Sequence, residues 1–194
     1  MKKSSILLIG AVAVLVFWCV SKYNGMVNLD ETVTQAWANV ENQYQRRADL
    51  IPNLVNTVKG YASHEEKTLE GVINARAKAT QVTIDPSNLT EENMQKFLEA
   101  QSAVSSALSR LMAVSEAYPE LKADKQFSEL MAQLEGTENR IGASRQEYNK
   151  EVRDYNVTIR NFPGNIVAMI FGFQRRAEFK AEAVTDKAPT VSFE

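Results

Sequence analysis

The sequence predicts an all-α protein: an N-terminal transmembrane helix followed by an up-and-down bundle of long antiparallel helices, three long and one short. Three observations predict this fold. An uncharged run of 18 residues, Ser4–Ser21, stands near the start of the chain. Apolar residues after it recur at alternating steps of four and three, as in helices that pack in a bundle. No segment of useful length shows the strict alternation that is typical of a strand.

Composition limits the classes of protein that remain. The 194 residues carry 22 Lys and Arg against 24 Asp and Glu, a net charge of −2. The length fits one domain with an appendage, and the near-neutral charge argues against nucleic-acid binding, which normally needs a basic face. The one cysteine, Cys19, excludes an intrachain disulfide and a multi-cysteine metal site. The one histidine, His64, excludes sites that need two.

The first segment is expected to be a retained membrane anchor. Residues Ile6–Val20 are uninterrupted by polar side chains, and the 18-residue uncharged run would span about 27 Å as a helix, close to the hydrocarbon thickness of a bilayer. A cleaved signal peptide is the alternative, because Lys2 and Lys3 would make a suitable start. The residues that follow, 21–24, do not form the small-residue cleavage site that a signal peptide requires.

Flanking charge predicts the orientation of this anchor. Lys2 and Lys3 precede the span, and only Lys22 follows it closely. The positive-inside rule therefore favours a cytoplasmic N-terminus, with the bulk of the chain outside the cytoplasmic membrane and, in a bacterium with two membranes, in the periplasm. The bias is two lysines to one, and the opposite orientation stays open.

A long apolar seam predicts the first bundle helix, from about Asn24 to Thr83. Arg47 and Glu65 interrupt the seam, and Pro52 inside it predicts a kink or break near Ile51. The apolar residues at seam positions are Val33, Trp37, Val40, Tyr44, Ile51, Leu54, Val58, Tyr61 and Val72.

Turn and cap residues set the bounds of the next two helices. Asp85-Pro86-Ser87 marks a break, and Thr90 is the expected N-cap of a helix that ends before Pro119. A third long helix is expected from about Leu121 to Asn161, with large apolar residues at seven-residue intervals. Phe162-Pro163-Gly164 should end it.

A short apolar stretch, Ile166–Phe173, follows the third helix and is too short to span a bilayer. An up-down-up course would place Phe162 at the end of the bundle far from the anchor. We therefore expect this stretch to form a helix that caps the bundle, or a contact patch. A location in the membrane interface is the alternative, because Arg175, Arg176 and Lys180 follow it.

Polar residues also recur at helical spacing on the first and third helices. Asn has poor helix propensity, so its repetition within helices needs a reason. One interpretation is a hydrated face with pairs such as Arg46 and Asp49. The other is a hydrogen-bond network between helices or subunits that fixes their register. Together with the two charges in the seam, the candidate network is Arg46, Arg47, Asp49, Asn53, Asn56, Glu65, Arg145, Asn149 and Asn156.

The predicted helices differ in length, which leaves part of the apolar seam without a partner. Val33, Trp37, Val40 and Tyr44 lie beyond the reach of the second helix and should be buried. Either subunits contact one another there, or a sharp bend at Pro52 folds the chain back. The sequence therefore supports the hypothesis that the chain self-associates as a homo-oligomer.

No constellation of residues points to catalysis. In His64-Glu65-Glu66 the histidine lacks the second histidine of a helical zinc site, and we expect it on a helix surface. Asp49 and Glu65 would lie about 24 Å apart on one helix, too far for paired acid–base chemistry. For Arg47 and Glu65 we expect a structural role, as charge pairs that are buried or lie between subunits. We expect no catalytic residue, no cofactor and no metal, and hence a protein that is not an enzyme.

The run Arg46–Val55, RRADLIPNLV, followed by Val58–Ala62 and His64-Glu65, resembles the signature of the LemA family. The resemblance covers nearly the whole chain. One departure is Ala117, because the family more often has Asn before the following Tyr. Further matching stretches are Tyr23-Asn24, Ala75-Arg76, Tyr118-Pro119-Glu120-Leu121, Tyr148-Asn149, Tyr155-Asn156 and Phe162-Pro163.

The resemblance implies a bacterial single-pass membrane protein with a helical bundle, and it brings no agreed activity. It also implies that the opposite orientation occurs, because some members are described with the bulk of the chain in the cytoplasm. The expected organisation is an anchor over residues 1–22, a bundle over 23–180 and an extended or disordered tail over 181–194.

These inferences lead to two hypotheses of function. The first is a non-enzymatic helical scaffold or adaptor at the bacterial envelope, which self-associates and binds the lipid bilayer and an envelope protein that the sequence does not name. The alternative is a sensor or signalling module that couples the bundle to the membrane helix.

Overall fold

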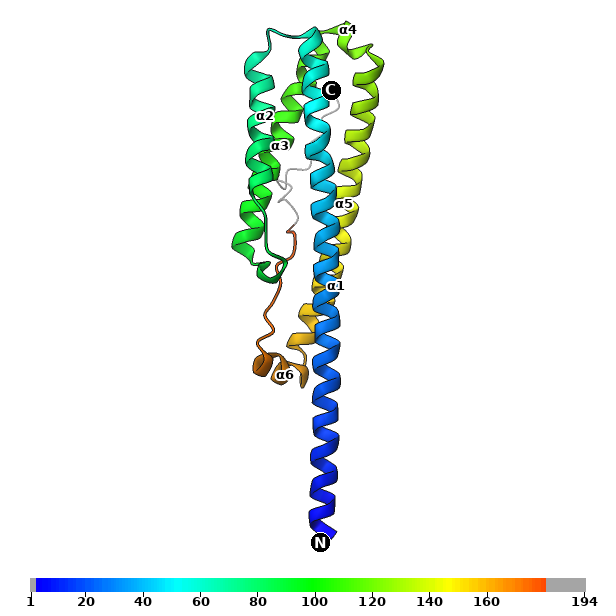
Figure 1. The fold of residues 1–194 in the computed structure, drawn as a ribbon, viewed down its shortest axis with the longest axis vertical. Helices are drawn as coiled ribbons and strands as arrows, with labels where there is room; N and C mark the ends of the chain where they lie inside the picture. The colour runs from blue at the N-terminus through cyan, green and yellow to red at the C-terminus, as the bar shows by residue number, and fades with distance from the viewer. Residues whose placement is uncertain (1–2, 181–194) are drawn as a thin grey trace, which may run out of the picture.

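The computed structural model describes residues 3–180, and the side chains of residues 7–180. These residues form an all-α bundle whose long helices run alternately up and down (Figure 1), as predicted. No strand occurs within residues 3–180. The predicted tail, 181–194, lies outside the described residues. The elements in order are α1 (Lys3–Tyr61), α2 (Glu66–Gln81), the 3-10 helix η1 (Pro86–Asn88), α3 (Glu91–Ala117), α4 (Pro119–Lys122), α5 (Lys125–Arg160) and α6 (Gly164–Phe171).

The apolar N-terminal segment that the sequence predicts as an anchor, and that we call the anchor below, shares one continuous helix with the bundle. α1 contains 59 residues and is therefore about 88 Å long. Its first turns stand clear of the other helices (Figure 1), and by length and composition this part of the helix could cross a membrane. The apolar side chains of Leu7–Val20 are mostly exposed, whereas Met26 is fully buried. The anchor thus passes into the core of the bundle without a linker.

The prediction of one helix from Asn24 to Thr83 is wrong. α1 ends at Tyr61, residues 62–65 form a turn, and α2 runs back along α1 (Figure 1). The pattern hid this turn because the apolar spacing continues across it: Val58 and Leu69, on opposite sides, are both buried. His64 consequently lies exposed in the turn and not within a helix.

Of the kink or break predicted near Ile51, the break is wrong, because α1 continues through Pro52. A proline inside a helix removes the N–H that would bond the carbonyl four residues earlier, here that of Ala48. Arg76 of α2 replaces that donor: its Nε donates to the Ala48 carbonyl oxygen at 2.7 Å. The neighbouring helix therefore satisfies the backbone group that the proline leaves without a partner.

The core consists of two apolar clusters stacked along α1, which we call proximal and distal by their distance from the anchor. The proximal cluster includes Met26, Val33, Trp37, Val40, Tyr44, Phe97, Tyr148, Val152, Tyr155 and Phe179. The distal cluster includes Ile51, Leu54, Val58, Leu69, Val72, Val104, Leu108, Leu111, Leu130 and Leu134. Between them, α1, α3 and α5 each contribute one buried polar residue, Arg47, Gln101 and Thr137.

The apolar residues that lacked a predicted partner are covered by the chain itself. The ring of Trp37 lies 5.2 Å from Phe97, 5.5 Å from Tyr148 and 6.0 Å from Phe179, measured between centroids. Val33, Val40 and Tyr44 are likewise buried. Self-association stays a prediction, but this stripe no longer supports it.

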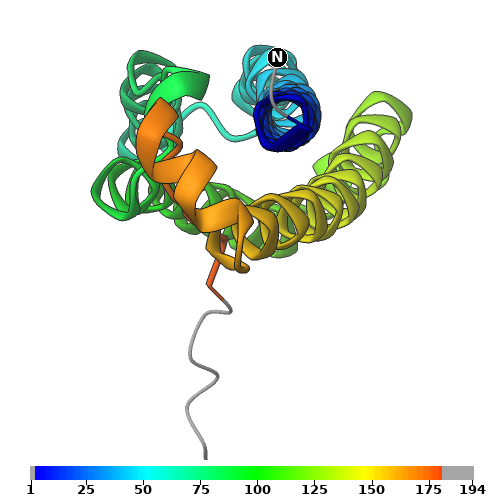
Figure 2. The ribbon, with the colours of Figure 1, turned by 90° about the horizontal axis from the view of Figure 1, so that it is seen from below.

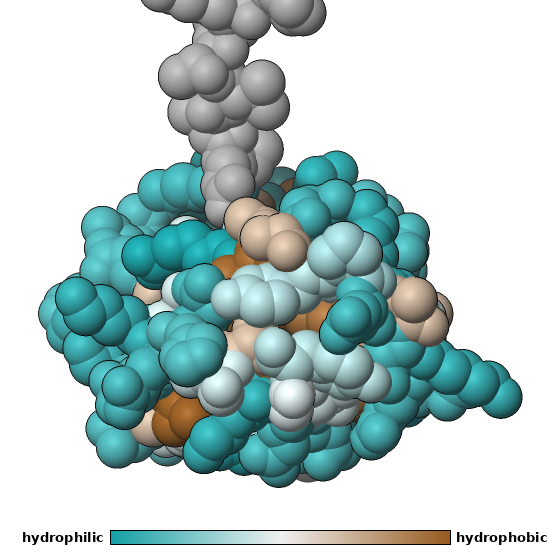
Figure 3. All heavy atoms as spheres, turned by 90° about the horizontal axis from the view of Figure 1, so that it is seen from above, coloured by the Kyte–Doolittle hydropathy of each residue, from teal (hydrophilic) through white to brown (hydrophobic). Residues whose placement is uncertain are grey.

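α5 returns to the end of the bundle that carries the anchor. The turn at residues 62–65 adds one antiparallel pass, so the chain runs up, down, up and down. Phe162 therefore lies near the anchor, and the prediction that it lies at the far end is wrong. A side chain at Gly164 would lie 2.9 Å from the Thr158 carbonyl oxygen and 3.1 Å from Met26 Cε, which places the start of α6 directly against α1. Seen from the opposite end, the surface is mostly hydrophilic (Figure 3).

The proline and its substitute donor should be energetically coupled. Arg76→Met should destabilise the full chain by about 1–2 kcal/mol, because the Ala48 carbonyl loses its donor. In the Pro52→Ala background the restored N–H bonds that carbonyl, and the cost should fall by about 1 kcal/mol. Denaturant unfolding in detergent micelles, followed by circular dichroism, measures both. Lys78→Met, an exposed change on α2, is the control; an equal cost of Arg76→Met in both backgrounds would contradict the coupling.

Candidate functional site

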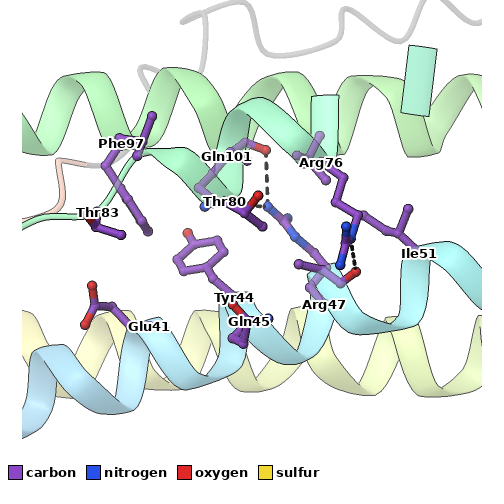
Figure 4. Close-up of a pocket in the computed structure, with 14 residues that line it drawn as sticks. Glu41, Tyr44, Gln45, Arg47, Ile51, Arg76, Thr80, Thr83, Phe97 and Gln101 are labelled. Carbon is purple, nitrogen blue, oxygen red and sulfur yellow. Dashed lines mark hydrogen bonds between the residues drawn. The ribbon is translucent and has the colours of Figure 1, made fainter. Parts of the chain in front are cut away.

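The buried polar layer is built around Arg47, whose residue is 2% exposed. Its Nη1 donates to Glu138 Oε1 at 3.0 Å and to Ser105 Oγ at 3.1 Å. Its Nη2 donates to Gln101 Oε1 at 2.6 Å and to the Gln101 carbonyl oxygen at 3.2 Å (Figure 4). One side chain of α1 thereby binds both α3 and α5.

A small cavity adjoins this layer. Its volume is about 90 Å³, which is room for a few water molecules. Glu41, Tyr44 and Arg76 contribute to its lining (Figure 4), and burial raises the pKa of the Glu41 carboxyl and of the Tyr44 hydroxyl. Within the described residues, no group of three or more His, Cys, Asp or Glu is placed to hold a metal ion.

A second polar arrangement on α5 binds the segment after α6, residues 173–180, which we call the strap. Asn156 donates from Nδ2 to the Arg176 carbonyl at 2.9 Å and accepts the Arg176 N–H at 3.0 Å. Asn149 does the same with Phe179, at 2.8 and 2.7 Å. Seven helical residues advance about 10.5 Å and three extended residues about 10 Å, so the two spacings match.

Two tyrosines and an arginine of α5 also bind the strap. The Tyr148 hydroxyl donates to the Ala177 carbonyl at 2.8 Å, and the Tyr155 hydroxyl to the Gln174 carbonyl at 2.9 Å. Burial raises the pKa of both tyrosines, so they remain protonated donors. The guanidinium of Arg145 lies 4.7 Å from the centre of the Phe179 ring, a cation–π geometry. Side chains of α5 thus bind the strap mainly at the backbone atoms of the strap.

The strap also attaches to α1 and to the connection before α3. Arg176 donates from Nε to Asp30 Oδ1 at 3.0 Å and from Nη2 to both carboxylate oxygens at 2.9 and 3.1 Å. Its Nη1 donates to the Ser87 carbonyl. The Ala177 N–H donates to the Leu89 carbonyl at 2.9 Å. The strap therefore connects three segments that are distant in sequence.

The predicted network separates into distinct places. Arg47 forms the polar layer, and Arg145, Asn149 and Asn156 bind the strap. Glu65 lies in the turn after α1, where the Tyr118 hydroxyl approaches its carboxylate at 3.4 Å. The remaining four predicted residues are exposed on α1, as on a hydrated face, and Asp49 there accepts a bond from Gln45 at 2.8 Å. These four are Arg46, Asp49, Asn53 and Asn56.

Sequence reasoning missed several partners of these residues. Gln101 interrupts the apolar row of α3 between Phe97 and Val104, and that interruption could have identified it. Arg176 belongs to a group of basic residues in the sequence, and nothing in the sequence pattern indicated that it pairs with Asp30. Other partners that the sequence reasoning missed are Arg76, Ser105, Glu138, Tyr148 and Tyr155.

These features define a class of protein: a helical bundle, closed by its own C-terminal strap, whose first helix continues into a segment that could cross a membrane. The chain belongs to the LemA family, whose family model matches residues 36–193.

The chain is also similar in sequence to individual proteins. The chain is 28% identical to magnetosome protein MamQ 2 of Paramagnetospirillum magneticum, over 88% of this chain and 69% of the relative. It is 28% identical to magnetosome protein MamQ of Magnetospirillum gryphiswaldense, over 85% and 67%. It is 22% identical to protein LemA of Metamycoplasma hominis, over 89% and 75%.

Two adjacent arginines should differ sharply in their contribution to stability. Arg47→Met would leave the buried acceptors of Gln101 without their donor and the half-exposed Glu138 carboxylate without its ion pair, at a cost of roughly 2–4 kcal/mol. Arg46→Met, on the exposed face, should stay within about 0.5 kcal/mol. Thermal unfolding of the full chain in micelles should show a midpoint lower by about 5–10 °C for Arg47→Met. Similar midpoints for the two variants would refute the role of the polar layer.

Removing the α5 amides should loosen the strap without melting the helices. In Asn149→Ala with Asn156→Ala, amide hydrogen exchange at Arg176 and Phe179 should become at least about tenfold faster, because their acceptors are gone. Helical content by circular dichroism should be unchanged. Asn53→Ala, an exposed asparagine on α1, is the matched control. Unchanged exchange at both amides in the double variant would show that the amides do not hold the strap.

Proposed function

We propose that this protein is a membrane-anchored, non-enzymatic scaffold or adaptor of the bacterial envelope, which binds a helical segment of another envelope protein on its distal half. The observation that carries the proposal is an apolar groove there, lined by residues of α3, α4 and α5, with a volume of about 660 Å³. The groove lies on a bundle that α1 connects directly to the anchor.

The groove combines an apolar floor with a charged rim. Met112, which is 44% exposed, and Met131 contribute flexible side chains to the lining, beside Phe127 and Leu134. Methionine adapts to differently shaped apolar partners. Glu135 and Glu138 lie at the rim, together with Lys122 and Asn139.

This lining suits an amphipathic helix. Such a helix would place apolar side chains at positions i, i+3, i+4 and i+7 on the floor, and a basic side chain near Glu135, because Glu138 is already paired with Arg47. A helix of a second copy would meet the same groove, and self-association is then a second outcome of the test below. The small cavity beside Arg47, whose donors are already engaged, supports a structural role for the polar layer.

The relatives fit a structural role without specifying one. Those named magnetosome proteins carry a name that refers to a cellular structure and not to a reaction. For location we propose the inner membrane, with the bundle on the extracytoplasmic side. The charge bias of Lys2 and Lys3 over Lys22 supports this orientation.

A second candidate function is a sensor that passes a signal from the bundle into the membrane. The continuity of α1 from Lys3 to Tyr61 favours it, because a helix without a break can transmit a rotation or shift along its length. A tethered scaffold does not need this continuity.

A photocrosslinking amino acid at Met131 tests the scaffold. In native membranes it should give one discrete adduct, since this side chain lines the groove, whereas the same amino acid at Ile73, on the exposed face of α2, should give none. Mass spectrometry of the adduct distinguishes a second copy from another protein. No adduct beyond that seen at residue 73 would contradict the proposal.

The same adduct separates the two candidate functions. Ser21→Gly with Lys22→Pro breaks α1 below the bundle, at two exposed positions. A scaffold should keep the adduct at residue 131, because its groove and tether remain. Loss of the adduct in this variant, with the protein still in the membrane, would favour the sensor.

A further inference from the structure

α6 lies beside α1 at the level where α1 leaves the bundle toward its apolar segment (Figure 1). The ring of Tyr23 is 4.7 Å from that of Phe171 and 5.7 Å from that of Phe173, between centroids. Tyr23 stands two residues after Ser21, the end of the uncharged run, which is about 3 Å along the helix. If the run spans a bilayer, α6 lies at the height of the lipid headgroups.

α6 is oriented to lie along such a surface. Seen along the bundle, it extends crosswise to α1 (Figure 2). Gly164 lets it begin directly against α1, and Gly172, with a φ of 78°, ends it in the left-handed conformation. One side faces the bundle, through the buried residues Gly164, Val167 and Ala168.

The other side of α6 is apolar and uncovered. Phe162 is 81% exposed, Met169 77%, Ile170 69%, Phe171 57% and Ile166 44%. Residues 166, 169 and 170 follow the spacing of a single helical face, and Phe162 lies in the turn just before the helix. Soluble proteins rarely expose a large contiguous apolar patch, and where one occurs it usually marks a binding site.

The charges around α6 suit an anionic lipid surface. Residues 160–176 contain three arginines and no acidic residue. Arg160 and Arg175, at the two ends of this segment, are exposed, and Lys22 is exposed on the adjoining turn of α1. Arg176 is bound to Asp30 and remains part of the bundle.

We propose that α6 is an interfacial helix that inserts its Ile166–Met169–Ile170 face, together with Phe162 of the preceding turn, into the bilayer leaflet at which α1 enters the membrane. Helices of this kind bury their apolar face about 5–10 Å into the boundary between headgroups and acyl chains, with basic residues at the headgroups. The bilayer is the occupant that fits, because the exposed face and the end of the apolar run lie at the same height.

The protein then touches the membrane at two points. A single spanning helix would let the bundle rotate and tilt about its axis, whereas a second contact beside it fixes which side of the bundle faces the membrane. This inference rests on the anchoring of α1 and is independent of the scaffold function. A negative crosslinking result at Met131 would leave it intact.

Site-directed fluorescence tests the lipid contact in the full chain. In a Cys19→Ser background, Met169→Cys is labelled with the fluorophore NBD and the protein is reconstituted in phosphatidylcholine vesicles containing phosphatidylglycerol. Quenching by nitroxide-labelled lipid should be at least about threefold stronger than at the control, Ile73→Cys, which is also exposed but lies on α2, far from α6. Quenching by aqueous iodide should be correspondingly weaker.

Two results would overturn the proposal. A label at residue 169 as accessible to iodide as the label at residue 73 would place α6 in water. Protection from both quenchers would mean that protein, and not lipid, covers this face. Circular dichroism verifies the fold of each labelled protein, and Ile170→Cys replaces Met169→Cys if the latter does not fold.

Discussion

The guanidinium of Arg47 is the point at which α1, α3 and α5 are held at one height. Above it lies an apolar cluster built from α1, α2, α3, α4 and α5, and below it a cluster built from α1, α3, α5, α6 and non-helical segments. Apolar contacts alone would tolerate a slip of one helix along another. The directed bonds to Gln101 and Glu138 are satisfied in one register only, so the polar layer aligns the two clusters with each other. Burying the charge of Arg47 costs desolvation free energy, and the hydrogen bonds that its guanidinium forms offset this cost.

The second constraint is the length of α1. No helix of the bundle is as long, so different elements cover different parts of it. α2 and most of α3 pack at the distal half, where Arg76 also compensates for Pro52, and only the first turns of α3 reach the proximal cluster. At the proximal half the strap takes the place of a helix, and its extended backbone is satisfied by amides and hydroxyls of α5. The polar stripe of α5 thus has a structural reason, since a strap without a neighbouring strand needs side-chain partners for its N–H and C=O groups.

Sequence patterns predicted the elements whose signals are local. The Thr90 N-cap is confirmed, since its hydroxyl accepts the Asn93 N–H, and the seam found the buried faces of α1 and α5. The same seam failed at residues 62–65, because its spacing continues through a turn that reverses the chain. Arg47 could be identified as a charge in an apolar row, and Asn149 and Asn156 as a polar stripe. Their partners on the strap could not, because backbone N–H and C=O groups leave no signature in the sequence.

The strap has a consequence for the order in which the chain acquires its structure. Phe179 completes the aromatic packing around Trp37, a residue 142 positions earlier in the chain. The α2–α3 pair and the turn after α1 are joined by short connections and can form while synthesis continues. The proximal half cannot close before almost the whole chain has left the ribosome, because contacts of such long separation form late. Until then the apolar face around Trp37 lacks the ring of Phe179, and a chain truncated before the strap would leave that packing incomplete.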